Sequence, residues 1–331
     1  MISPRGYTIL FSVSCAYIMK TTSSINRRTF LKTSAAAAVG AALLNTQSSF
    51  AEDSNEKNVR TAADQVTLGN TGIKLSRLGF GAGTNSGQVQ RNLGHEEFNK
   101  VIRHAYERGI TYYDTAESYQ THTWLREALQ GIPREKLFIQ TKIPGGVRTT
   151  EETLERVERY LKELGTDYID SLLIHCQVAH DWDEKMKPVM EGLEKAKEKK
   201  MIRVHGISSH SLPAIRRAIA CDWCQTMLVR VNPLGHQTDS ESEQWNAQSS
   251  PEFIPNLLYL LQKASAKGKG VIAMKLVGNG DFKNPADREK TMRFVMNIPD
   301  INAAVIGFKS IAEVDESIER MNNALKEARV D

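Results

Sequence analysis

The sequence predicts an α/β fold, a (β/α)8 TIM barrel preceded by an N-terminal β-hairpin. Eight short segments rich in β-branched or aromatic residues alternate with amphipathic helical patterns along the 331-residue chain. Their spacing leaves room for one strand and one helix in each unit, as in such barrels. Hydrophobic residues at 40% and charged residues at 25% are ordinary globular values, which exclude a mostly disordered chain. A doubly wound open sheet is the alternative arrangement of the same elements.

The elements follow in chain order, beginning with the hairpin. Residues 66–68 and 73–75 flank the turn-rich segment 69–72, a pattern typical of two short antiparallel strands. The eight strand candidates that follow are residues 78–81, 111–114, 137–142, 168–175, 202–207, 227–231, 271–275 and 303–306.

Helices are predicted between these strands, where apolar residues recur at helical spacing. Residues 98–105 carry apolar side chains on one face. Residues 154–164 do the same and follow Thr149 and Glu152, which have the spacing of a capping box. The last helix is predicted over residues 311–325.

The first 51 residues have the features of an export signal. Arg27 and Arg28 precede an apolar run at 35–44, which is too short to span a bilayer but suits the core of a signal peptide. Residues 49–51 then offer a small-residue cleavage site. The combination resembles a bacterial twin-arginine export signal, and an amphipathic or disordered tail is the alternative.

This interpretation divides the chain into a signal peptide, residues 1–51, and a barrel domain, residues 52–331. We expect the twin-arginine translocase as a partner during export, cleavage near Ala51 and a periplasmic destination. The signal segment holds basic residues and no acid, so the barrel domain is close to neutral although the net charge of the chain is +4. Nucleic-acid binding, which needs a basic stripe, is therefore not expected. Stable membrane insertion is not expected either, because no apolar run approaches about 20 residues.

The cysteines of the barrel domain indicate a structural role. Cys221 and Cys224 have a spacing found in redox and metal sites, but a single pair cannot supply four ligands. The pair also follows a helical pattern at 214–220, and the C-terminal end of a helix disfavours a thiolate. We therefore expect buried or disulfide-linked structural cysteines and no metal site.

Four titratable residues are placed at one rim of the predicted barrel. The chemistry of such barrels lies at the C-terminal ends of the strands. Asp114, Lys142 and His175 end three neighbouring strand candidates, and Tyr119 lies in the loop after the first of these. Each residue alone has a structural interpretation, such as a helix cap, a packing residue or a solvated charge. It is their joint placement that predicts a catalytic site.

These four side chains suit the reduction of a carbonyl group by hydride transfer, which needs a proton for the developing alkoxide. A tyrosine, whose ordinary pKa is about 10, serves as the acid when a nearby ammonium lowers that pKa. Lys142 is expected to lower the pKa of Tyr119, with Asp114 holding the ammonium in place. His175 is expected to bind the substrate oxygen and position it.

The same residues also carry a family resemblance. The segments LGNTGIKLSRLGFG at 68–81, DTAESY at 114–119, TK at 141–142 and LLIH at 172–175 resemble the aldo-keto reductases, and the resemblance extends over roughly residues 64–325. It implies an NAD(P)H-dependent oxidoreductase that acts on a small aldehyde or ketone, normally with NADPH. It also implies a catalytic tetrad with a tyrosine as general acid, here Asp114, Tyr119, Lys142 and His175.

The resemblance places cofactor contacts in two regions. Ser208 and Ser209 stand where the family holds the carboxamide with a Ser-Asn pair. Lys309 and Ser310 resemble the family's phosphate loop, although they also suit a solvated charge and a helix N-cap. Glu313 stands where the family clamps the 2′-phosphate with an arginine, and a carboxylate there would repel a phosphate. NADH is therefore the alternative to NADPH.

Lys275 is a further cofactor candidate. It ends the seventh strand candidate and is followed by a glycine-rich turn at 278–280. Backbone N–H groups of such a turn can approach a pyrophosphate, and an ordinary loop is the alternative.

Two other functions remain open at this point. A non-catalytic nicotinamide-binding module of the same fold would explain why the cofactor positions depart from the family pattern. A barrel lyase would use Lys142 or Lys275 to form a Schiff base with its substrate.

Overall fold

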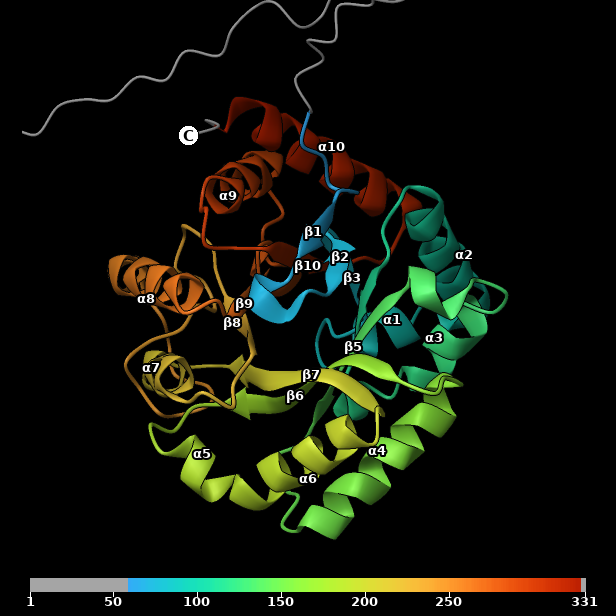
Figure 1. Ribbon diagram of the computed structural model, residues 1–331. Coiled ribbons are helices and arrows are strands. Elements are labelled where there is room, and N and C mark those ends of the chain that lie inside the picture. Colours follow the sequence, from blue (N-terminus) through green and yellow to red (C-terminus); the bar gives the residue numbers. More distant parts are fainter. Residues whose placement is uncertain (1–58, 329–331) are drawn as a thin grey trace, which may run out of the picture. The chain divides into compact units, whose positions relative to one another are not determined.

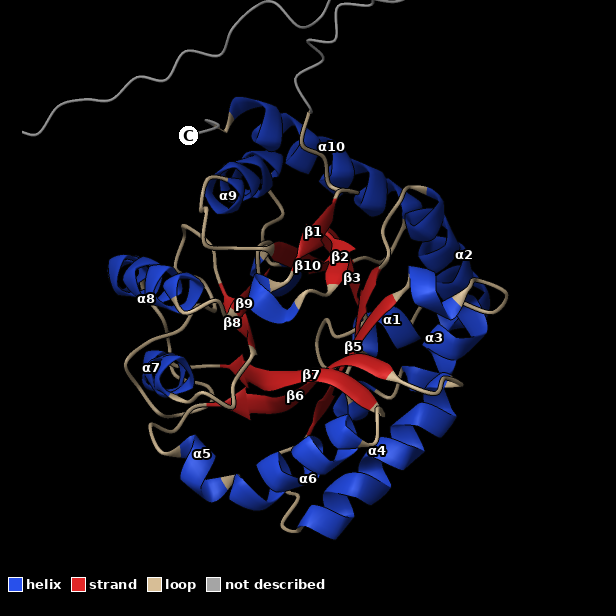
Figure 2. Cartoon of the chain, in the orientation of Figure 1, coloured by secondary structure: helices blue, strands red, loops and turns tan. Residues whose placement is uncertain are grey.

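The computed structural model describes residues 59–328, and its centre is a closed barrel of eight parallel strands (Figures 1 and 2). Around the barrel the order is β10-β3-β4-β5-β6-β7-β8-β9, and pairing of β9 with β10 closes the ring. The predicted (β/α)8 barrel is confirmed, and the open sheet is excluded. The signal predicted at 1–51 lies outside the described residues.

Each barrel strand overlaps one of the eight strand candidates. A barrel strand is buried on both faces, so its residues are almost all apolar or β-branched. Short apolar runs in the sequence therefore predicted all eight strands. The strands are β3 (Leu78–Gly81), β4 (Tyr112–Asp114), β5 (Phe138–Ile143), β6 (Ile169–Gln177), β7 (Ile202–Ser209), β8 (Thr226–Arg230), β9 (Gly270–Met274) and β10 (Ala303–Gly307).

Helices surround the barrel on the outside, as Figure 2 shows in blue. Over the described part of the chain, none of them is long and apolar enough to cross a membrane. The helices are α1 (Gln88–Arg91), α2 (Gly94–Glu107), α3 (His122–Ala128), α4 (Thr150–Leu164), α5 (Trp182–Lys185), α6 (Lys187–Glu198), α7 (Leu212–Ala220), α8 (Ile254–Ala266), α9 (Pro285–Met296) and α10 (Ile311–Glu327).

Helix α4 shows how local sequence sets the boundaries of a helix. At its start the N–H of Glu152 donates to the Thr149 hydroxyl oxygen at 3.0 Å, as the predicted capping box requires. At its end the chain turns at Gly165 with φ +66°, a conformation that costs glycine little and other residues more. Between these ends Val157 and Tyr160 are buried against the barrel.

The predicted hairpin is formed by β1 (Gln65–Thr67) and β2 (Lys74–Ser76), which pair antiparallel. In Figure 1 it lies across the centre of the ring of strands. Leu68, Ile73 and Leu75 pack in one apolar cluster with Tyr112 and Phe138, which begin their strands. The hairpin therefore closes the N-terminal end of the barrel, so that the opposite end is left for a site.

Cys221 and Cys224 are both free thiols. Cys224 is buried, and its Sγ donates to the Thr226 carbonyl at 3.4 Å. The predicted burial is found for Cys224, Cys221 is partly exposed, and the disulfide alternative is not formed.

Candidate functional site

The C-terminal ends of neighbouring strands hold a buried ion pair between Lys142 and Asp114. The Lys142 Nζ lies 2.7 Å from each Asp114 carboxylate oxygen and donates a further bond of 2.7 Å to the Thr115 carbonyl. Lys142 is 1% exposed and Asp114 is 5% exposed. The Gln140 amide also donates to Asp114, at 2.8 Å. The ammonium and the carboxylate of the pair thus both have hydrogen-bond partners, as buried charges require.

Tyr119 lies over this pair and contacts the predicted histidine. Its ring centroid is 4.9 Å from the Lys142 Nζ, and its hydroxyl is 3.3 Å from His175 Nε2. Gly83 makes room for the ring, because a Cβ added there would lie 2.3 Å from a Tyr119 ring carbon. The four residues predicted for the catalytic site therefore lie together at one rim.

The protonation states at this rim are set mainly by burial. Burial, then the nearby charge of Asp114, raises the pKa of Tyr119 well above its usual value, so Tyr119 is a neutral phenol. The expected net lowering of this pKa is therefore wrong. Burial, then Lys142 and Lys275, lowers the pKa of His175 to about 3, so its imidazole is neutral. A neutral phenol and a neutral imidazole can both hydrogen-bond a carbonyl oxygen.

A cavity of about 1010 Å³ opens at this rim, and its wall includes Tyr119 and His175. Ser208 and Lys275, two of the predicted cofactor contacts, also line it. Ser209 does not, because its hydroxyl donates to the Ser211 carbonyl at 2.9 Å. The prediction of Ser209 as a cofactor ligand is not supported by the position of its side chain.

A second cavity, of about 400 Å³, adjoins the first, because Asn85 and Asn279 line both. Lys309 and Glu313 line this groove beside the start of α10. Ser310 is the N-cap of α10, and its hydroxyl accepts a bond of 3.3 Å from the Glu313 N–H. The hydroxyl oxygen of Ser310 thus caps the helix, and its O–H remains able to donate to a phosphate oxygen.

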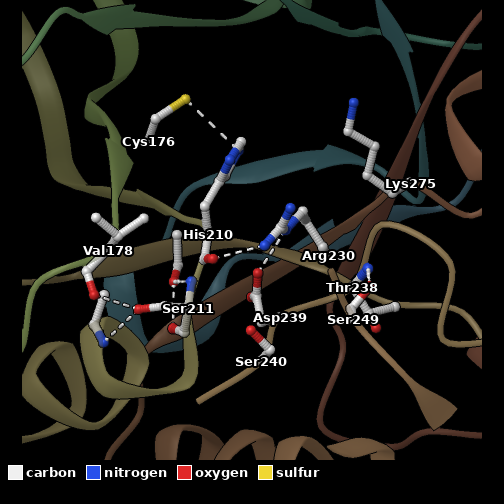
Figure 3. Close-up of polar contacts among 12 residues, drawn as sticks. Cys176, Val178, His210, Ser211, Arg230, Thr238, Asp239, Ser240, Ser249 and Lys275 are labelled. Carbon is white, nitrogen blue, oxygen red and sulfur yellow. Dashed lines mark hydrogen bonds and ion pairs between the residues drawn. The ribbon is translucent and has the colours of Figure 1, made fainter. Parts of the chain in front are cut away.

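Arg230, which the sequence analysis did not predict as a site residue, lines the larger cavity (Figure 3). It ends β8, the same position on its strand that Asp114 has on β4. Its Nε donates to Asp239 at 2.6 Å and its Nη2 donates to the His210 carbonyl at 2.6 Å. The rule that located the tetrad, a polar residue at a strand end, also applies to Arg230.

Comparison with known proteins agrees with this geometry. The profile of the Aldo/keto reductase family matches residues 77–319. The profile of the TAT (twin-arginine translocation) pathway signal sequence matches residues 24–43, so the chain carries an export signal, with the periplasm as destination. The export expected from the paired arginines is confirmed.

Curated relatives match parts of the chain. "Probable aldo-keto reductase 1" of Glycine max is 28% identical over 66% of this chain and 60% of its own length. "9,11-endoperoxide prostaglandin H2 reductase" of Trypanosoma cruzi is 33% identical over 44% of this chain and 47% of its own length. The matches thus span less than two thirds of these relatives.

Solved structures share the fold. A putative aldo-keto reductase from Pseudomonas aeruginosa has a TM-score of 0.63 at 24% identity, covering 80% of this chain and 97% of its own. The aldo-keto reductase from Klebsiella pneumoniae in complex with NADPH has a TM-score of 0.58 at 18% identity, covering 80% of this chain and 90% of its own.

Proposed function

This chain belongs to the aldo-keto reductase family, and from that premise we propose that it reduces aldehydes or ketones with a nicotinamide cofactor, Tyr119 being the general acid. The observation that carries the proposal is the position of the Tyr119 hydroxyl, 3.3 Å from His175 Nε2 and on the wall of the larger cavity. A carbonyl oxygen placed between these two groups receives two hydrogen bonds.

The four side chains divide the work of the reaction. A bound nicotinamide supplies the hydride that the carbonyl carbon accepts. Tyr119 donates its hydroxyl proton to the carbonyl oxygen, which leaves an alcohol and a phenolate. Lys142, held by Asp114, stabilises that phenolate, and His175 positions the carbonyl oxygen through Nε2.

The residues of the two adjoining cavities fit a nicotinamide dinucleotide. Lys309 lines the smaller of them, and its ammonium suits phosphate oxygens. Phosphates bind commonly near the last strands of such barrels. The bound NADPH of the Klebsiella pneumoniae neighbour supports NADPH for this chain, with NADH as the alternative.

Glu313→Gln is expected to tighten NADPH binding about three- to tenfold relative to NADH. The Glu313 carboxylate accepts the Lys309 N–H at 2.9 Å and lies 3.6 Å from the Lys309 Nζ, so it occupies donors that suit a phosphate. The substitution removes one negative charge, and a unit charge about 4 Å away is worth about 1 kcal/mol in bulk water. Fluorescence titration with both nucleotides measures the two dissociation constants.

The matched control for this variant is Glu319→Gln, which removes the same charge from an exposed position on α10. It should change neither dissociation constant. An unchanged NADPH-to-NADH ratio in Glu313→Gln would show that the 2′-phosphate lies elsewhere.

Turnover of the purified protein tests the proposed reaction. NADPH or NADH should be oxidised only when an aldehyde or ketone is added. Tight nucleotide binding without turnover over a broad carbonyl panel would favour the non-catalytic binding module. The lyase alternative predicts a covalent adduct on borohydride trapping, which is not expected at Lys142 because Asp114 holds its ammonium at 2.7 Å.

A further inference from the structure

The wall of the larger cavity is cationic. Arg230 and Lys275 both line it, and no aspartate or glutamate is among its described lining residues. The other polar groups on the wall are uncharged, and they include hydroxyls, imidazoles, amides, the Cys176 thiol and the Trp245 indole. Asp239 neutralises Arg230 from outside this lining, so Lys275 carries the unbalanced positive charge of the wall, and a cavity with such a charge attracts anions.

Arg230 is fixed so that part of its guanidinium remains available. The residue is 7% exposed, and Asp239, which anchors its Nε, is fully buried. Its Nη2 is used by the His210 carbonyl, as Figure 3 shows. Its Nη1 has no hydrogen-bond acceptor among the described residues. An arginine held in this way presents a pre-oriented donor to a ligand.

Lys275 is the second cation, and no described carboxylate pairs with it. Its Nζ donates only to the neutral Asn279 side-chain oxygen, at 2.7 Å, among the described residues. Its backbone has φ +65°, a left-handed conformation that is unfavourable for a lysine and is held by the surrounding structure. Burial, then the charge of Arg230, lowers the pKa of Lys275 to about 8. An anion bound between these two cations would offset their repulsion.

We infer that this cavity binds a carbonyl compound that carries a carboxylate, held by Arg230 and Lys275 while its carbonyl oxygen lies at Tyr119 and His175. The inference rests on the proposed function and names the substrate class of the same site. A carboxylate oxygen accepts charge-assisted bonds from both cations, and a neutral carbonyl compound makes no such bonds.

A matched pair of aldehydes tests this inference. 4-Carboxybenzaldehyde and 4-carbamoylbenzaldehyde have nearly the same shape, and only the first is anionic. Succinate semialdehyde and its amide form a second, flexible pair that does not depend on one distance between the groups. In the natural protein, kcat/KM should be about tenfold or more higher for the carboxylate than for the amide in at least one pair. One hydrogen bond to a charged group has an effect of this size.

Lys275→Met should lower this preference at least fivefold. The control, Lys263→Met, removes the same charge from an exposed position on α8 and should leave the preference unchanged. If Lys275→Met does not fold, the double variant Arg230→Met with Asp239→Asn removes the other cation without stranding a buried carboxylate. That variant should lower the preference as well.

The pH dependence gives an independent readout. Lys275 is protonated below a pKa of about 8 and neutral above it, so it attracts a carboxylate only at the lower pH. The preference for the carboxylate should be full below about pH 8 and fall as the pH rises. In Lys275→Met this fall should disappear.

The outcomes separate this inference from the proposed function. If no compound of the broad carbonyl panel is reduced, the proposed function fails. If other carbonyl compounds are reduced and neither carboxylate is, the inference is overturned and the proposed function stands. If both members of both pairs are reduced equally well, the inference is overturned and the proposed function stands. If Lys275→Met weakens nucleotide binding in a fluorescence titration and leaves the preference unchanged, Lys275 serves the cofactor and the inference is overturned.

Discussion

Tyr119→Phe is expected to abolish carbonyl reduction while leaving nucleotide binding intact. The substitution removes only the hydroxyl, which lies 3.3 Å from His175 Nε2 and is the proton donor of the proposed reaction. General acid catalysis contributes about 10²–10⁴-fold to a rate, so kcat should fall by at least about 10²-fold. Steady-state kinetics with an accepted aldehyde measures the loss, and fluorescence titration measures the dissociation constant of the nucleotide.

Tyr168→Phe is the matched control, because it also removes one phenolic hydroxyl. The Tyr168 ring lies under the Arg134 guanidinium, at 4.0 Å, and does not line the larger cavity. Its activity should equal that of the natural protein. A Tyr119→Phe protein with full activity would refute the proton-donor role and, with it, the proposed mechanism.

The sequence was sufficient to predict that the four proposed catalytic residues lie together, because the alternation of strands and helices determines which strand ends meet. Asp114 ends β4 and Lys142 lies near the end of β5, and these strands pair in parallel. Parallel neighbours present their C-terminal ends at one rim, so two residues far apart in sequence become neighbours. Spacing alone therefore predicted the Lys142–Asp114 pair.

Contacts that depend on loops could not be predicted in this way. Asp239 lies in the connection after β8, and its bond to Arg230 depends on how that loop folds over the rim. Ser209, in contrast, lies beside Ser208 in β7, and because successive side chains of a strand point to opposite faces, its hydroxyl turns to Ser211 and not to the cavity. The raised pKa of Tyr119 was not predicted either. It follows mainly from burial of the phenol, and burial is determined only by the assembled structure.

Asp114→Asn is expected to destabilise the protein by about 3–5 kcal/mol and to abolish reduction. The substitution leaves the Lys142 ammonium buried without its carboxylate, and removing one partner of a buried pair carries a penalty of this size. The remaining acceptors are the Thr115 carbonyl and one amide oxygen. Unfolding in denaturant measures the loss of stability, and steady-state kinetics with an aldehyde measures the loss of activity.

A double variant, Asp114→Leu with Lys142→Met, separates the structural role of this pair from its catalytic role. Because both charges are removed together, no buried ion is left unpaired, and much of the lost stability should return. Reduction should not return, since no ammonium then lies 4.9 Å from the Tyr119 ring to stabilise the phenolate. A stable double variant that still reduces aldehydes at the natural rate would show that Lys142 serves only the fold. A stable and inactive one would assign the Lys142–Asp114 pair to the chemistry, because the rate is then lost without a loss of stability.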